Sequence, residues 1–149
     1  MDYLNLTPTE RILDWRNFRK NLKNKSENDQ LESIAKYWAN VPISTYSIDW
    51  DHPEIWSTPW EVLYDFDLDD TLVAYMMEQT LILSGWNIER INLCYIKDIK
   101  QEEQLMVVIV DNKYLLNYSV GEVFELDRIK NDCIFLIKYQ YINNQHIEV

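Results

Sequence analysis

The apolar residues of this sequence change their spacing at Gly85, and no other feature constrains the fold as strongly. Before Gly85 they recur at steps of three and four residues, the period of an amphipathic α-helix. After Gly85 the sequence has short runs rich in Val, Ile and Tyr, which favour β-strands. A chain with helices first and strands second is typical of the α+β class with an antiparallel sheet.

Two capping boxes mark where helices begin. Thr7-Pro8-Thr9-Glu10 predicts a helix to about residue 22, and Thr58-Pro59-Trp60-Glu61 predicts a short helix to about residue 64. Between them, a helix that ends before Pro42 has apolar residues at helical spacing, so we expect it to pack on the first helix as a hairpin. A last helix covers residues 72–83 and ends before Gly85.

The second half of the chain predicts about four antiparallel strands, at residues 91–96, 105–110, 114–118 and 134–141. Asp111-Asn112-Lys113 predicts a tight hairpin turn between two of them. With 149 residues, of which 47% are hydrophobic, the chain predicts a single domain over residues 1–149 with one sizeable core.

Negative charge is concentrated in the middle of the sequence. The formal net charge is -11, and residues 1–25, 26–85 and 86–149 carry +3, -11 and -3. This balance disfavours direct nucleic-acid binding, which needs clustered Lys and Arg. The basic first helix lying against the acidic segment is one interpretation, and an exposed acidic surface is the other.

No stretch is apolar enough to indicate a membrane segment or a secretion signal, so we expect a cytoplasmic protein. The two cysteines, Cys94 and Cys133, interrupt apolar runs and predict buried free thiols.

His52 lies among acids and His146 in a polar tail, and neither has the spacing of a metal site. Trp50 and Trp56, in an irregular acidic loop, fit either the core or a partner surface.

The segment Asp67-Leu68-Asp69-Asp70-Thr71 resembles the first motif of haloacid-dehalogenase-type phosphatases. The resemblance implies Asp67 as nucleophile, Asp69 as general acid/base and magnesium as cofactor. The later motifs of that family and its alternating α/β pattern are missing.

An EF-hand calcium loop starting at Asp65 fails because Asp70 replaces the required glycine and Met76 the bidentate Glu. The same acids are also expected at the start of a helix, where they accept its free amides.

Several short sequence stretches, and the order in which they follow one another, resemble those of small proteins of T4-like tailed bacteriophages. The stretches that carry this resemblance are Thr7-Pro8-Thr9-Glu10-Arg11-Ile12-Leu13-Asp14-Trp15-Arg16, Tyr37-Trp38, Asp51-His52-Pro53, Trp56 and Pro59-Trp60-Glu61. It implies a phage accessory protein that acts in the cytoplasm of the infected host cell.

The helix followed by strands that lead to Lys113-Tyr114-Leu115-Leu116-Asn117-Tyr118 is similar in order to a transglutaminase-like, papain-like core. The resemblance implies a Cys at the helix start, a His on the next strand pair and an Asp or Asn beyond it. Here the helix start carries Leu68, Asp69 and Asp70, residues 105–110 contain no His, and only Asn117 matches the third position. A related fold would therefore be a scaffold without the chemistry.

Because every catalytic pattern is incomplete, the sequence predicts a non-enzymatic acidic factor that binds a host or phage protein and needs no cofactor. Magnesium belongs only to the phosphatase alternative with Asp67 and Asp69. The surface that we expect to bind the partner comprises Asp49, Trp50, Asp51, Trp56, Asp65, Asp67, Asp69 and Asp70.

Overall fold

The computed structural model describes residues 5–149 as four helices followed by an antiparallel sheet. The helices are α1 (Pro8–Leu22), α2 (Glu27–Tyr37), α3 (Pro59–Asp65) and α4 (Asp70–Leu83). The strands are β1 (Ile91–Asp98), β2 (Glu103–Val110), β3 (Tyr114–Leu116), β4 (Phe124–Glu125), β5 (Cys133–Ile142) and β6 (Gln145–Glu148). Short 3-10 turns lie at Pro53–Ile55 (η1), Ile88–Arg90 (η2) and Leu126–Arg128 (η3).

The α+β class and the order of elements are confirmed, but the sheet has six strands in the order β4-β3-β2-β1-β5-β6, not about four. The two extra strands span two and four residues and lie at the sheet edges. Strands this short have too few residues to display an alternating pattern. Within the described residues, no helix is long and apolar enough to cross a membrane.

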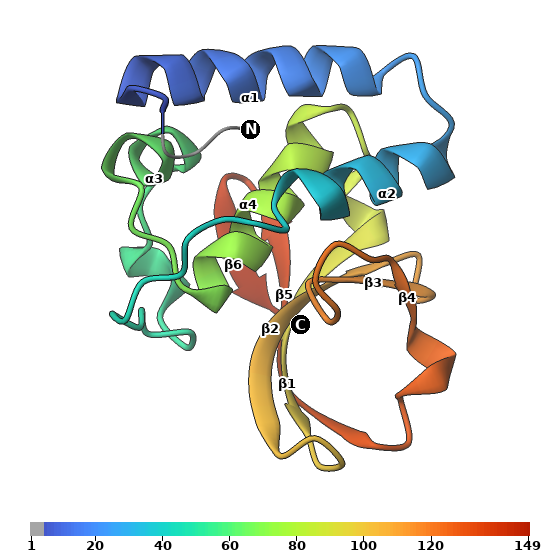
Figure 1. The fold of residues 1–149 in the computed structure, drawn as a ribbon. Helices are drawn as coiled ribbons and strands as arrows, with labels where there is room; N and C mark the ends of the chain where they lie inside the picture. The colour runs from blue at the N-terminus through green and yellow to red at the C-terminus, as the bar shows by residue number, and fades with distance from the viewer. Residues whose placement is uncertain (1–4) are drawn as a thin grey trace.

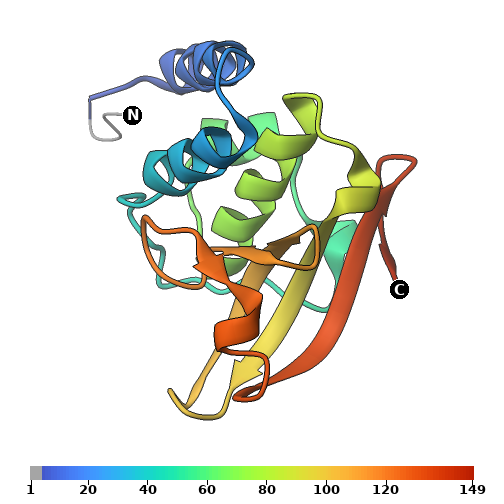
Figure 2. The ribbon, with the colours of Figure 1, turned by 90° about the vertical axis from the view of Figure 1, so that its right-hand side faces the viewer.

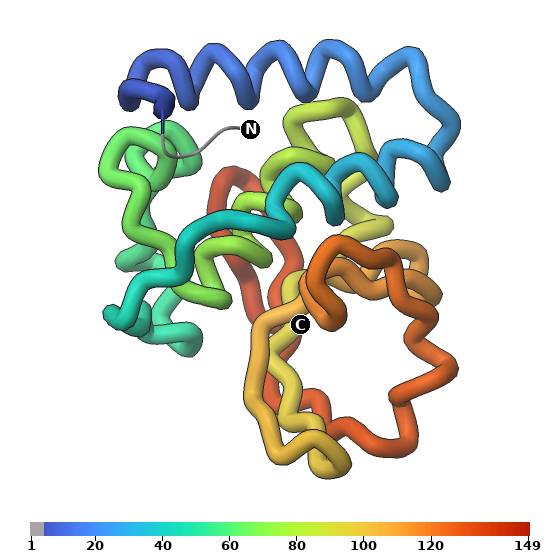
Figure 3. The backbone as a smooth tube through the Cα atoms, in the orientation of Figure 1, coloured from blue at the N-terminus to red at the C-terminus, as the bar shows by residue number. Residues whose placement is uncertain are grey.

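The helices cover one face of the sheet, and the chain from β3 to β5 curves around the other face (Figures 1, 2 and 3). β1 and β2 send alternate side chains to the two faces, and both sets are buried. The helix side receives Ile91, Leu93, Met106, Val108 and Val110, and the other side receives Cys94, Ile96, Leu105, Val107 and Ile109. Burial on both faces explains why these strands are almost continuously apolar.

Both capping boxes form as predicted, with Thr7 paired to Glu10 and Thr58 paired to Glu61. The chain reverses between α1 and α2, where Phe18 stacks on Tyr37 at 3.9 Å between ring centroids. The Tyr37 hydroxyl donates to Asp14 Oδ2 at 2.6 Å. The first two helices are thus joined by an aromatic and polar contact.

Arg11 fastens α1 to the end of α3. Its guanidinium donates to the carbonyl oxygens of Leu63 at 2.7 Å, Leu6 at 2.8 Å and Tyr64 at 2.9 Å, and lies over the ring of Phe66. The bonds to Leu63 and Tyr64 satisfy carbonyls that the end of α3 leaves without intrahelical partners.

Among residues 5–149, no ion pair joins the cations of α1 to a carboxylate of the acidic segment. The first helix does lie against the acidic segment, at α3, but Arg11 makes this contact through backbone carbonyls and not through ion pairs.

We expect Arg11→Met to lower the free energy of unfolding by about 3 kcal/mol, because buried carbonyls lose charge-assisted hydrogen bonds. Arg16→Met on the exposed side of the same helix is the matched control, with an expected change within about 0.5 kcal/mol. Urea unfolding monitored by tryptophan fluorescence measures both. Equal losses in the two variants would contradict the role of Arg11.

Candidate functional site

Two adjacent carboxylates tie the start of α4 to its surroundings. Asp69 is the N-cap of α4, and its Oδ1 accepts from Leu72 N–H at 2.9 Å. Its second oxygen, Oδ2, accepts from Ile48 N–H at 2.8 Å in the preceding loop. Asp69 is 8% exposed, so this carboxylate joins loop to helix in the interior.

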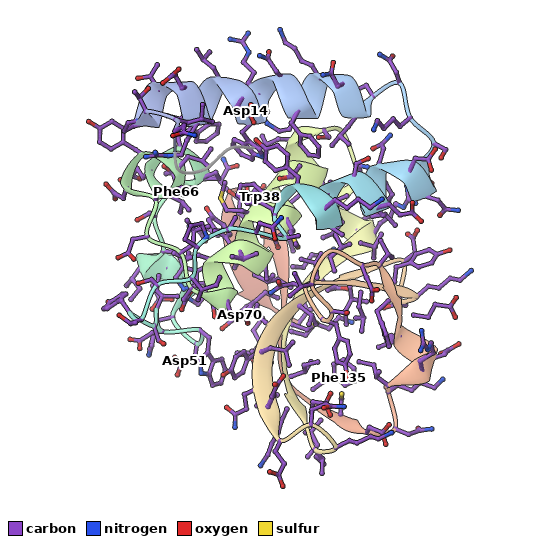
Figure 4. The ribbon with its side chains drawn as sticks, viewed as in Figure 1. Asp14, Trp38, Asp51, Phe66, Asp70 and Phe135 are labelled. Atoms are coloured by element: carbon purple, nitrogen blue, oxygen red, sulfur yellow. The ribbon has the colours of Figure 1, made fainter. Side chains whose placement is uncertain are left out.

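Asp70 connects the same helix start to the sheet (Figure 4). Its Oδ2 accepts from the backbone N–H of Met106 on β2 at 2.9 Å, and its Oδ1 accepts from Asn117 Nδ2 at 2.9 Å. Asn117, just after β3, also donates to the carbonyl of Met106 at 2.9 Å. Helix start, β2 and the segment after β3 therefore meet in one closed hydrogen-bonded set.

Burial raises the pKa of Asp70 to about 6, although its bonds from Met106 N–H and Asn117 favour the charged form. The neighbouring negative charge of Asp69 adds to the increase in pKa. Beside Asp70 and Asn117 lies a hollow of about 150 Å³. This volume is below the range of about 300–1,000 Å³ that ligand pockets occupy.

The phosphatase motif does not lie in the setting that its chemistry needs. Asp67 is exposed in the turn between α3 and α4, after Phe66, which ends α3 in the left-handed region at φ 52°. A catalytic aspartate of that family follows a strand of a parallel sheet. Here the named strands pair antiparallel, and Leu68 of the motif makes an isolated parallel bridge to Ile43 and belongs to no strand. The local match comes from helix-start carboxylates, with Asp69 as the cap.

Asp65, Asp67 and Asp69 line a hollow of about 460 Å³ together with Tyr46 and Ile55. Tyr46 is 68% exposed and Ile55 is 60% exposed. Sequence reasoning missed these two residues because an irregular loop has no period that separates inward from outward side chains. We call this set of five residues the acidic hollow.

The remaining predicted partner residues lie in the loop that leads to α3. Asp49 and Asp51 are exposed, and Figure 4 places Asp51 at the periphery. Trp50 is half-buried and stacks on Tyr95 of β1 at 3.9 Å between centroids. Trp56 is also half-buried, and its indole N–H donates to the carbonyl of Asp49 at 2.9 Å. The two tryptophans hold the loop on the core and still leave part of their surface exposed.

His146 does not lie in a polar tail, so that prediction is wrong. It belongs to β6, its side chain is 5% exposed, and its Nε2 lies 2.6 Å from Oε1 of the fully buried Glu78. The turn at Asn143 and Asn144, both with positive φ, folds β6 back along β5 and brings His146 to α4. An Asn-Asn pair after an apolar run is the sequence signal for such a turn.

The other titratable candidates are in separate places. His52 is exposed and pairs with Glu54 at 3.0 Å, and that carboxylate raises the pKa of the imidazole. Burial raises the pKa of Cys94 to about 12 and that of Cys133 to about 11, so neither thiol ionises at neutral pH. No three His, Cys, Asp or Glu side chains within residues 5–149 converge to hold a metal ion.

Comparison with solved structures decides the fold. The chain is similar to calcium-bound LapG of Legionella pneumophila, with a TM-score of 0.74 and 16% identity over 97% of this chain and 84% of that one. Two further LapG structures, one of them EGTA-treated, give TM-scores of 0.73 and 18% identity over 89% of this chain. The two alignments cover 74% and 73% of the LapG chains.

LapG has a transglutaminase-like, papain-like cysteine-protease fold. This chain has that fold. The structural similarity confirms the predicted resemblance at the level of architecture, and at this identity it shows the fold alone. Neither a known protein family nor a curated protein sequence matches the chain.

The transglutaminase-like resemblance places the nucleophile, the base and its orienting group at a helix start, on the next strand pair and beyond it. Here the helix start holds Asp69 and Asp70, β2 holds no His, and Asn117 follows β3. Asp70 and Asn117 bond to each other and to the backbone of Met106 on β2. Cys94 lies in the middle of β1 in the core on the far face of the sheet. The positions that the resemblance implies for catalysis therefore contain no cysteine and no histidine.

We expect the stability of Asp70→Asn relative to wild type to increase as pH rises, on top of a constant loss because an amide replaces one of the two accepting oxygens. The folded-state pKa of about 6 lies above the ordinary 3.8, so the contribution of Asp70 to wild-type stability is fully present only below about pH 4 and is lost as pH rises through 6. The difference between variant and wild type should grow by up to about 3 kcal/mol between pH 4 and pH 7.5.

Urea unfolding at four pH values measures this difference. Asp67→Asn, which removes a charge at an exposed position, corrects for the change in net charge. A difference between Asp70→Asn and wild type that stays constant over this pH range would show that Asp70 is not the titrating group.

Proposed function

We propose that this chain is a transglutaminase-like domain without catalysis, which acts as an acidic protein-binding module. One observation carries the proposal: at the helix start, where the resemblance implies a cysteine, Asp70 is bonded to Asn117 and to the backbone of Met106 in a closed hydrogen-bonded set. Both Asp70 oxygens accept hydrogen bonds within this set, and cysteine chemistry needs a thiolate beside a base.

The exposed acids support a basic partner. Asp49, Asp51, Asp65 and Asp67 are exposed on one segment of the chain, and none of them pairs with a cation of α1 in the described residues. Tyr46 and Ile55 add exposed apolar area in the acidic hollow. A charged surface with an apolar centre favours a protein partner, because charge steers the encounter and apolar contact holds the complex.

Asp69 and Asp70 contribute to this surface indirectly. Both are committed to internal hydrogen bonds that position the loop and the helix start on either side of the acidic hollow. The partner that we propose is a host or phage protein with a basic surface, met in the cytoplasm of the infected cell. The resemblance to tailed-phage proteins supports this setting, and the proposed binding needs no cofactor.

We expect the combined change Asp49→Asn, Asp51→Asn, Asp65→Asn and Asp67→Asn to reduce recovery of the partner at least tenfold. The measurement is affinity capture with the tagged full chain from infected host cells, followed by identification and quantification of the bound protein. For the unchanged chain, recovery should also fall as salt rises, because exposed charges are screened.

The control variant changes Glu89, Glu102, Glu103 and Glu125 to Gln, which alters net charge equally at exposed positions on the other half of the chain. It should retain the partner. Equal recovery by the two variants would contradict the acidic surface, and peptide hydrolysis abolished by Asp70→Asn would contradict the absence of catalysis.

A further inference from the structure

A second and larger hollow lies on the other side of the segment 53–58. It has a volume of about 680 Å³ and is walled by η1, the start of α3, α4 and the β5–β6 hairpin. Ser57 borders both this hollow and the acidic hollow. We call it the aromatic pocket, because its lining includes Trp56, Trp60, Tyr75, Tyr141 and His146.

We propose that the aromatic pocket binds an arginine side chain of the protein partner. This inference rests on the proposed function and adds the chemistry of one contact to it. Three observations support it: the arrangement of the rings, the charged residues around them and the stacking of the chain's own arginines on aromatic rings.

The two tryptophans of the pocket have no stacked neighbour among the described residues. Trp56 meets Tyr75, Tyr139 and His146 edge-on or tilted, at 5.5, 6.2 and 5.2 Å between centroids. Trp60 meets Trp15 edge-on at 6.2 Å and is 44% exposed. An indole ring face is the best side-chain surface for a cation.

The described lining of the pocket contains one acid, Glu54, and neither Lys nor Arg. Glu54 also pairs with His52 at 3.0 Å outside the pocket lining. Behind His146 lies Glu78, fully buried, with Oε1 bonded to His146 at 2.6 Å and to Gln79 Nε2 at 3.2 Å. Its second oxygen, Oε2, has no hydrogen-bond partner within the described part of the chain. A buried acceptor without a partner is costly, and a cation nearby would reduce that cost.

The chain's own arginines favour arginine over lysine as the occupant. Four of its five arginines lie over an aromatic ring, with the guanidinium carbon 4.2–4.5 Å from the centroid. None of the five cation–ring contacts of residues 5–149 involves Trp56, Trp60, Tyr75 or Tyr141. A guanidinium can stack on a ring and donate in its plane to Glu54 or to Gln79 Oε1, which an ammonium cannot do.

The test uses the peptide acetyl-Gly-Gly-Arg-Gly-Gly-amide and its matched forms with citrulline or lysine at the central position. Citrulline has the shape of arginine without the charge. NMR spectra of the full chain follow the indole N–H signals of Trp56 and Trp60 during titration. We expect the arginine peptide to shift both signals saturably, at least tenfold more tightly than the citrulline peptide and fivefold more tightly than the lysine peptide.

Trp60→Leu should weaken the arginine peptide at least fivefold, and Glu54→Gln should weaken it at least twofold. Tyr64→Leu, one turn further along α3, exposed and outside the pocket, is the matched control and should leave binding unchanged. Equal binding of the citrulline or lysine peptide, or full binding by Trp60→Leu, overturns the proposal.

The same variants separate this inference from the proposed function. If Trp60→Leu still captures the partner from infected cells while the four-aspartate variant does not, the arginine pocket fails and the acidic module stands. If the peptide binds as expected but neither variant changes partner capture, the pocket stands and the proposed module fails.

Discussion

The structure depends on the hydrogen bonds that the carboxylates of Asp69 and Asp70 accept at the start of α4. Asp69 joins the helix to the preceding loop, and Asp70 joins it to the sheet. α4 is buried over most of its length, so its position determines where both layers of the protein meet. An N-cap alone contributes about 1 kcal/mol. The second oxygen of Asp69 adds a long-range connection to this cap, and both oxygens of Asp70 make long-range connections.

These connections occupy the place where the transglutaminase-like resemblance implies catalysis. Asp70 and Asn117 bond to each other and to the backbone of Met106. The acidic hollow and the aromatic pocket lie elsewhere, on the two sides of the segment 53–58. A shared fold does not by itself assign a function, which has to be argued from the residues of the site.

Local signals predicted most of the elements. The two capping boxes were sufficient for α1 and α3, because a cap and its partner lie only three residues apart. The apolar runs located β1, β2, β3 and β5, and the Asp111 turn joins β2 to β3 as expected. The edge strands β4 and β6 were missed because their hydrogen-bond partners, not their own residues, make them strands. His146 was misplaced for the same reason.

The sequence by itself determined the class of the fold, the helix starts, the uneven distribution of charge and the absence of Cys and His from the positions where a transglutaminase-like core would need them. Each of these depends on residue type or on contacts within a few positions. Only the tertiary structure decided that Asp70 bonds to Met106 and Asn117, and that Glu78 lies against His146, 68 residues away. It also divided the acidic segment into buried carboxylates that accept internal hydrogen bonds and carboxylates that are exposed. Such pairings depend on how α4 and the sheet pack, and no local pattern encodes that packing.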